Sequence, residues 1–133
     1  MIKKIDHIAI AVSNLKEAAR FYEENLGLKL SGDENLPEQG VKVGFIQIGE
    51  VRIELVEPLS PTSPISKFLA EKGPGLHHIC FEVDDIEKEL SRLAEAGVRL
   101  IDSKPRPGAH NTKVAFIHPK ASGGVLIEFS QKV

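Results

Sequence analysis

The pattern of apolar and polar residues predicts the same strand and helix twice along the chain. Residues 4–12 and 76–83 are rich in β-branched side chains and are bounded by polar residues, which indicates two β-strands. Apolar residues then recur at helical spacing across residues 14–26 and 85–96, which indicates a helix after each strand.

Start and stop signals support both predicted helices. Asn14 and Asp85 stand where N-caps belong, because their side chains can accept a hydrogen bond from the first helical turn. Gly27 and Gly97 follow the last periodic residues, as C-terminal glycines usually do. We therefore expect two short, separately capped helices.

The similarity extends beyond these elements. The segment DHIAIAVSNLKEAARFYEENLGLKL, from Asp6, aligns with HHICFEVDDIEKELSRLAEAGVRL, from His77. The segment VKVGFIQIGEVRIELVEP, from Val41, aligns in turn with TKVAFIHPKASGGVLIEFSQ, from Thr112. Two segments that match in the same order indicate an internal duplication.

Each half has the pattern of a strand, a helix and three further strands. We predict one α+β domain over residues 1–133, made of two duplicated βαβββ modules that form a curved, mixed-sheet cup. The modules span about 4–58 and 76–131, and the linker 59–75 is rich in proline and serine. Within the linker, residues 65–72 are expected to form a short helix.

Two histidines and two glutamates occupy equivalent positions in the modules. His7 aligns with His78, and Glu54 aligns with Glu128. Because side chains alternate along a strand, all four point away from the apolar face that packs on the helices. Sheets that meet on this face would bring the four together. Imidazole and carboxylate groups bind divalent ions, so the sequence predicts one such ion, with Co²⁺, Mn²⁺, Ni²⁺, Mg²⁺ and Zn²⁺ as candidates.

The remaining histidines and the single cysteine lack this support from the repeat. His77 aligns with Asp6, so we expect a neighbouring polar residue rather than a ligand. His118 lies in a turn-like HPK segment and is expected to be structural. His110 lies in the loop KPRPGAHNT, which either covers the site or is exposed. Cys80 has no partner cysteine and is interpreted as a small packing residue.

Composition narrows the possible partners and location. With 41% hydrophobic and 27% charged residues, the 133-residue chain is typical of a globular protein. A net charge of −2 gives no electrostatic basis for binding nucleic acid. No apolar stretch approaches the roughly 20 residues that span a bilayer. One cysteine excludes an intrachain disulfide, so we expect a cytoplasmic protein. Because no apolar stretch is long enough to span a bilayer, we expect no membrane partner.

Several motifs together resemble the vicinal oxygen chelate superfamily and, within it, the methylmalonyl-CoA epimerases. The resemblance covers nearly the whole chain and is carried by DHIAIAV, SPISKFL, GLHHICFEV, KPRPGAH, FIHPK and GGVLIEFSQ. It implies metal-dependent epimerisation of methylmalonyl-CoA through an enolate, an acyl-CoA partner and the homodimer that is common in this fold. By this likeness His7, Glu54, His78 and Glu128 match the family's metal positions, and Glu128 also resembles a catalytic base.

One position departs from some members of the family. Val43 stands where they have a glutamate, and valine cannot transfer a proton. Inversion needs a base on each face of the enolate, so Glu38, Glu54 or a water is left for the second role.

Other functions of the same fold remain open. A lactoylglutathione lyase of the glyoxalase I type uses the same enolate chemistry. Binding proteins of this fold typically lack the metal ligands, and extradiol dioxygenases use two histidines and one glutamate on iron, usually in a longer chain.

Overall fold

The computed structural model describes residues 1–133, and the chain divides into two compact units. Residues Ile8–His77 form the middle unit, and residues Met1–His7 together with His78–Val133 form the terminal unit. The boundary falls inside the first strand, so each unit takes one part of it.

The middle unit is a four-stranded sheet with two helices. Its strands follow the order β2-β3-β4-β1, and both β2–β3 and β3–β4 are antiparallel. The elements are β1 (Ile2–Ala11), α1 (Leu15–Leu26), β2 (Gly32–Leu36), β3 (Val41–Ile48), β4 (Val51–Pro58) and α2 (Pro64–Lys72).

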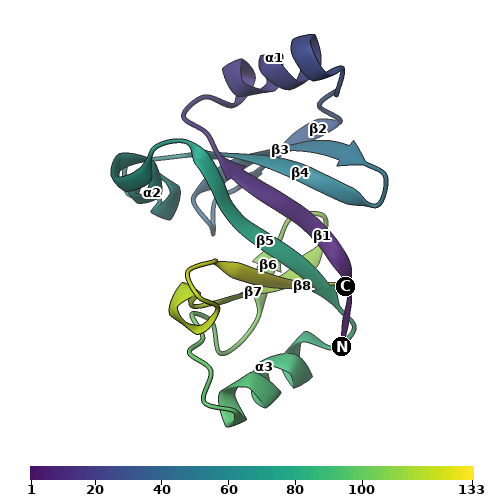
Figure 1. Ribbon diagram of the computed structural model, residues 1–133, viewed down its shortest axis with the longest axis vertical. Coiled ribbons are helices and arrows are strands. Elements are labelled where there is room, and N and C mark those ends of the chain that lie inside the picture. The colour runs from purple at the N-terminus through teal and green to yellow at the C-terminus, as the bar shows by residue number, and fades with distance from the viewer. The chain divides into compact units, whose positions relative to one another are not determined.

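The terminal unit repeats this plan around the other part of β1. Its strands follow the order β1-β5-β8-β7-β6, with β5 and β8 parallel and β8, β7 and β6 antiparallel (Figure 1). The elements are β5 (Gly75–Val83), α3 (Ile86–Glu95), β6 (Arg106–Gly108), β7 (Thr112–Ile117), the 3₁₀ helix η1 (Pro119–Ala121) and β8 (Ile127–Lys132).

The predicted helices and their N-caps are confirmed, as is Gly27 at the end of α1, whereas α3 is capped by Ala96, one residue before the predicted Gly97. The side chain of Asn14 accepts a hydrogen bond from the backbone of Glu17 at 2.9 Å, and that of Asp85 accepts one from Lys88 at 3.1 Å. Gly27 ends α1 with a φ of 70°, a left-handed conformation that glycine adopts without strain. The short linker helix is also present, as α2.

The predicted alternation of faces is confirmed in both units. The apolar face of each sheet packs on its own helix, α1 in the middle unit and α3 in the terminal unit. The two buried clusters are Val12, Leu15, Ala19, Ile46 and Leu55 in the first, and Val83, Ile86, Leu90, Ala115, Ile117 and Phe129 in the second. The opposite face of each sheet carries the polar residues predicted to bind the metal.

One strand boundary differs from the prediction. The repeat places the last strand on GGVLIEFSQ, but β8 begins only at Ile127, and Val125 is 43% exposed. The preceding Gly123 and Gly124 both have positive φ, so the backbone is still turning when it reaches Val125.

Gly44 fixes the distance between β3 and α1. A Cβ atom at this position would lie 2.8 Å from Cδ1 of Leu15 and 3.0 Å from Cδ1 of Leu30. We expect Gly44→Ala to lower the free energy of unfolding by about 1–3 kcal/mol through overpacking, measured by urea denaturation. Adding Leu15→Val should recover part of this loss, and an unchanged midpoint for Gly44→Ala would contradict the packing argument.

None of the three α-helices combines the length and apolar character that crossing a membrane requires.

Candidate metal centre

Three of the four predicted ligands meet in the terminal unit. His7, His78 and Glu128 lie on three adjacent strands, β1, β5 and β8. Nε2 of His7 is 3.3 Å from Nε2 of His78, and Oε1 of Glu128 is 3.0 Å from the first nitrogen and 2.8 Å from the second. We call these three residues the triad.

The spacing of the triad fits one face of an octahedral ion. Ligand atoms about 2.1 Å from a metal and at right angles lie about 3.0 Å apart, close to each of the three measured edges. Glu128 is only 4% exposed, and its Oε1 has no hydrogen bond of acceptable geometry despite these two close nitrogens. Because a buried oxygen without a hydrogen bond is costly, this arrangement is better explained by a shared cation than by direct pairing. The residues present therefore fit a divalent metal.

Asp6 orients the ring of His7. Its Oδ2 lies 2.7 Å from Nδ1 of His7, and both side chains are buried. A proton on Nδ1 leaves the lone pair of Nε2 to point into the triad, which is the arrangement of a carboxylate–histidine–metal relay. The internal repeat indicates Asp6 only as the residue aligned with His77. The signal that was missed is a carboxylate directly beside a proposed histidine ligand.

This contact gives a prediction for Asp6→Asn. An amide at this position is a weaker acceptor and no longer raises the basicity of His7, so the affinity for a divalent ion should fall about 10–100-fold. Competition titration with a chelating dye measures this. Asp33→Asn, on an exposed position of β2, is the control and should leave the affinity unchanged; equal losses in the two variants would argue against the relay.

The electrostatic surroundings keep Glu128 ionised. Burial by itself would raise the pKa of this carboxyl, but in the metal-free protein the positive charge of the protonated rings of His78 and His7 holds its pKa well below the ordinary value. An ionised, buried carboxylate can serve either as a metal ligand or as a base.

Cys80 lies next to the triad but does not extend it. It is fully buried and pairs with Glu128 across β5 and β8. Burial and, after it, the charge of Glu128 raise the pKa of the thiol to about 12, so the metal-free protein keeps Cys80 as a neutral thiol near neutral pH. This agrees with the predicted packing role.

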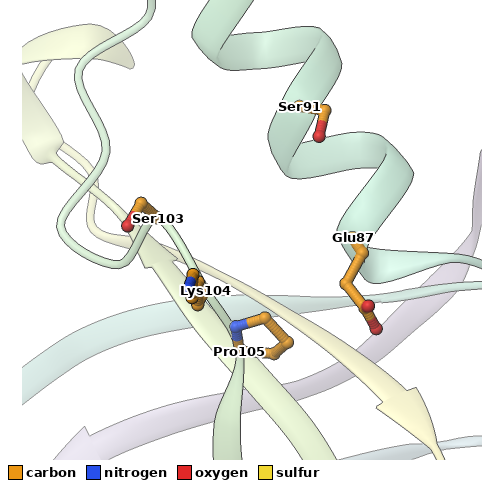
Figure 2. A pocket seen from close by; sticks show the side chains of 5 residues that line it. All are labelled: Glu87, Ser91, Ser103, Lys104 and Pro105. Carbon is orange, nitrogen blue, oxygen red and sulfur yellow. The ribbon is translucent and has the colours of Figure 1, made fainter.

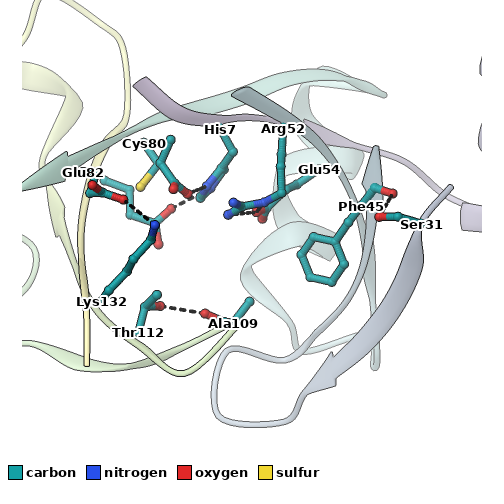
Figure 3. Close-up of polar contacts among 12 residues, drawn as sticks. His7, Ser31, Phe45, Arg52, Glu54, Cys80, Glu82, Ala109, Thr112 and Lys132 are labelled. Atoms are coloured by element: carbon teal, nitrogen blue, oxygen red, sulfur yellow. Dashed lines mark hydrogen bonds and ion pairs between the residues drawn. The ribbon is translucent and has the colours of Figure 1, made fainter. Parts of the chain in front are cut away.

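Glu54 is held on the corresponding face of the middle unit. It lies on β4, is 5% exposed, and accepts a hydrogen bond from Nη2 of Arg52 at 3.0 Å (Figure 3). The guanidinium of Arg52 also lies 6.0 Å from the ring centre of Phe45. These contacts fix the carboxylate of Glu54, whose role as a fourth ligand stays a prediction.

A further carboxylate shares the face of Glu54. Glu34 of β2 pairs directly with Val43 of β3, and Phe45 of the same strand pairs with Glu54 of β4. Paired residues and residues two apart share a face, so Glu34 and Glu54 project to the same side. Glu34 is half-buried, and its direction depends on the pairing of β2, which the sequence pattern does not predict.

The other predicted residues lie outside the triad. His118 caps η1 by accepting a hydrogen bond from the backbone of Lys120, which confirms its structural role. The ring of His77 packs edge-on against Phe68 at 4.9 Å. His110 is exposed, with a φ of 55° in the turn between β6 and β7.

A pocket of about 470 Å³ lies on the helix side of the terminal unit and contains none of the predicted site residues (Figure 2). Its lining residues are Glu87, Ser91, Ser103, Lys104 and Pro105.

Comparison with known proteins finds relatives that span nearly the whole chain. The ethylmalonyl-CoA/methylmalonyl-CoA epimerase of Cereibacter sphaeroides is 46% identical over 134 residues, covering 98% of this chain and 99% of the relative. A Streptomyces coelicolor methylmalonyl-CoA epimerase variant, solved in complex with 2-nitronate-propionyl-CoA, superposes with a TM-score of 0.95 at 32% identity, covering 100% of this chain and 96% of the other. A lactoylglutathione lyase of Neisseria meningitidis is 29% identical, covering 95% of this chain and 88% of the relative.

A family model matches residues 6–116 of this chain. This range includes three of the four predicted ligands, His7, Glu54 and His78. This chain therefore belongs to the glyoxalase/bleomycin resistance protein/dioxygenase superfamily.

Proposed function

We propose that this protein is a metal-dependent epimerase that interconverts the two epimers of methylmalonyl-CoA through an enolate of the substrate. The observation that carries the proposal is the triad of His7, His78 and Glu128, of which His7 and Glu128 are buried, in a chain that has an epimerase of this substrate among its relatives of nearly equal length. The coenzyme A thioester bound by the Streptomyces coelicolor protein supports an acyl-CoA as the partner.

The proposed ion is divalent and is held by the triad together with Glu54. A cation at this position would act as a Lewis acid that stabilises the negative charge developing on the substrate oxygen, worth several kcal/mol. The nitrogen and oxygen donors are compatible with Co²⁺, Mn²⁺, Ni²⁺, Mg²⁺ and Zn²⁺, so the identity of the ion is left to elemental analysis.

Glu128 is proposed to remove the proton from the α-carbon. Its carboxylate is ionised in the free protein, as a base must be before the reaction, and its burial excludes water that would compete for the proton. The α-proton passes to a carboxylate oxygen, and the electron pair of the C–H bond moves into the enolate.

Inversion requires a second proton carrier for the opposite face of the enolate. Strands β2, β3 and β4 contain four carboxylates, and only Glu34 and Glu54 share the face that carries the proposed fourth ligand. Glu54 is assigned to the ion, so we assign the second proton transfer to Glu34, in place of the valine at position 43. Glu38 lies in the exposed turn after β2, outside these strands.

Deuterium incorporation tests the function. Metal-loaded protein in D₂O should convert one epimer of methylmalonyl-CoA into the other and place one deuterium on the α-carbon of the product, followed by NMR. Glu34→Gln should stop the inversion while still exchanging the α-proton of the epimer that faces Glu128. Asp33→Asn, on the neighbouring position of β2 and the other face, should behave like the unaltered protein.

The glyoxalase alternative makes the opposite prediction. A lactoylglutathione lyase would leave methylmalonyl-CoA free of deuterium and consume the hemithioacetal of methylglyoxal and glutathione. The lower identity to such a lyase and the matching length of the epimerase relative favour the epimerase. A non-catalytic binding protein would not need the buried triad.

Two parts of the proposal concern the cell and the assembly. We infer a cytoplasmic location from the single buried cysteine. We infer a homodimer from the resemblance to the family. Light scattering coupled to size-exclusion chromatography tests the dimer.

A further inference from the structure

Arg106 places a positive charge on the face of the terminal unit that carries the triad. It pairs with Val114 across β6 and β7, and Val114 pairs with Ser130 across β7 and β8. Directly paired residues share a face of a sheet, and Ser130 shares its face with Glu128 two positions earlier. The side chain of Arg106 is therefore on the same side as the triad, opposite α3.

One aromatic ring connects Arg106 to the triad. The guanidinium carbon of Arg106 lies 5.5 Å from the ring centre of Phe116, within range of a cation–π contact. The ring of Phe116 in turn meets that of His78 edge-on, with their centres 5.2 Å apart. Phe116 is 8% exposed, and its buried ring lies between the guanidinium of Arg106 and the ring of His78.

The hydrogen bonding of Arg106 is incomplete. Its Nε is buried and has no hydrogen bond, although Oδ2 of Asp102 lies 3.6 Å away. That oxygen instead accepts a hydrogen bond from the backbone of Phe116 at 2.9 Å. Asp102 thus offsets part of the positive charge of Arg106 without accepting a hydrogen bond from its Nε. The side chain is 40% exposed, which leaves the guanidinium accessible to a ligand.

We propose that Arg106 binds an anionic oxygen group of the substrate. This inference rests on the proposed function, since the acyl-CoA is what brings such groups to the site. The candidates share one chemistry: the carboxylate of the acyl part, and the phosphates of coenzyme A. Either presents two or more oxygens to the planar fork of a guanidinium, which forms paired hydrogen bonds that a lysine cannot reproduce. The contact with Phe116 restrains the guanidinium before the substrate arrives.

A neighbouring cation provides a matched control. Lys104 is exposed on the same segment but lines the pocket beside α3 with Glu87 and Ser91 (Figure 2). Lys104→Gln therefore removes the same charge two residues before Arg106 without changing the face of the triad.

The experiment compares Arg106→Gln, Arg106→Lys and Lys104→Gln with methylmalonyl-CoA and with methylmalonyl-pantetheine, which lacks both the adenosine and the phosphates of coenzyme A. We expect Arg106→Gln to lower kcat/KM about 10-fold to 100-fold, the range for a charge-assisted hydrogen bond. Arg106→Lys should recover part of the loss, and Lys104→Gln should match the unaltered protein. A loss of equal size on both thioesters assigns Arg106 to the carboxylate; a loss confined to the coenzyme A thioester assigns it to a phosphate.

Two readouts separate binding from a structural role. Isothermal titration with malonyl-CoA should show the same weakening in Arg106→Gln without turnover, while the affinity for Mn²⁺ stays unchanged. Equal binding of malonyl-CoA by Arg106→Gln and the unaltered protein, or a parallel loss of Mn²⁺ affinity, would overturn the inference. Absence of epimerisation in the unaltered protein would instead count against the proposed function, and the titration would still decide the role of Arg106.

Discussion

Replacing Glu128 with glutamine is expected to lower the kcat of epimerisation by about 10²- to 10⁴-fold, the usual contribution of a positioned base. Glutamine keeps an oxygen that can bind a cation but cannot accept the α-proton. The variant should therefore keep more of its metal than of its activity. Elemental analysis after dialysis and the kinetics of each epimer measure the two quantities on the same sample.

Glu54→Gln is the matched variant for this prediction. Glu54 occupies the equivalent position of the other module, so the same substitution changes a proposed ligand that is not assigned a proton. Its activity should fall only as far as its metal content falls. If both variants lost metal and activity in equal proportion, Glu128 would be a ligand alone.

The duplication explains why so much of the fold was predictable from one sequence. Two weak patterns, at residues 4–26 and 76–96, support each other because they recur in the same order, and both helices formed with the predicted N-caps. The same repeat selected His7, His78 and Glu128 from the other polar residues of the chain. Their convergence depends only on strand parity and on three strands lying side by side, which the structure confirms.

The residues that the sequence did not indicate depend on interactions outside the repeat. Asp6 aligns with a histidine, so the duplication gave it no role, and only the 2.7 Å contact with His7 identifies it. Glu34 and Arg106 lie on β2 and β6, the outer strands, whose pairing decides which way a side chain points. A shift of one residue in either register would reverse that direction, and the sequence of a short polar strand does not fix its register.

Replacing His78 with alanine is expected to abolish the stabilisation that a divalent ion gives to the folded protein. An ion that binds only the folded chain raises the free energy of unfolding by about 2.7 kcal/mol when its free concentration is 100 times Kd. Loss of a nitrogen from the triad raises Kd, so at the same concentration this gain should nearly vanish. Thermal unfolding with and without the ion measures it for each variant.

The difference between the two melting temperatures is the informative quantity, because His78 also packs against Phe116 and its removal will lower stability without any metal. His77→Ala is the control: the residue lies next to His78 on β5, and its ring contacts Phe68. His77→Ala should keep the full increase in melting temperature on addition of the ion. If His78→Ala kept it as well, at a concentration that saturates the unaltered protein, the ion would be bound somewhere other than the triad.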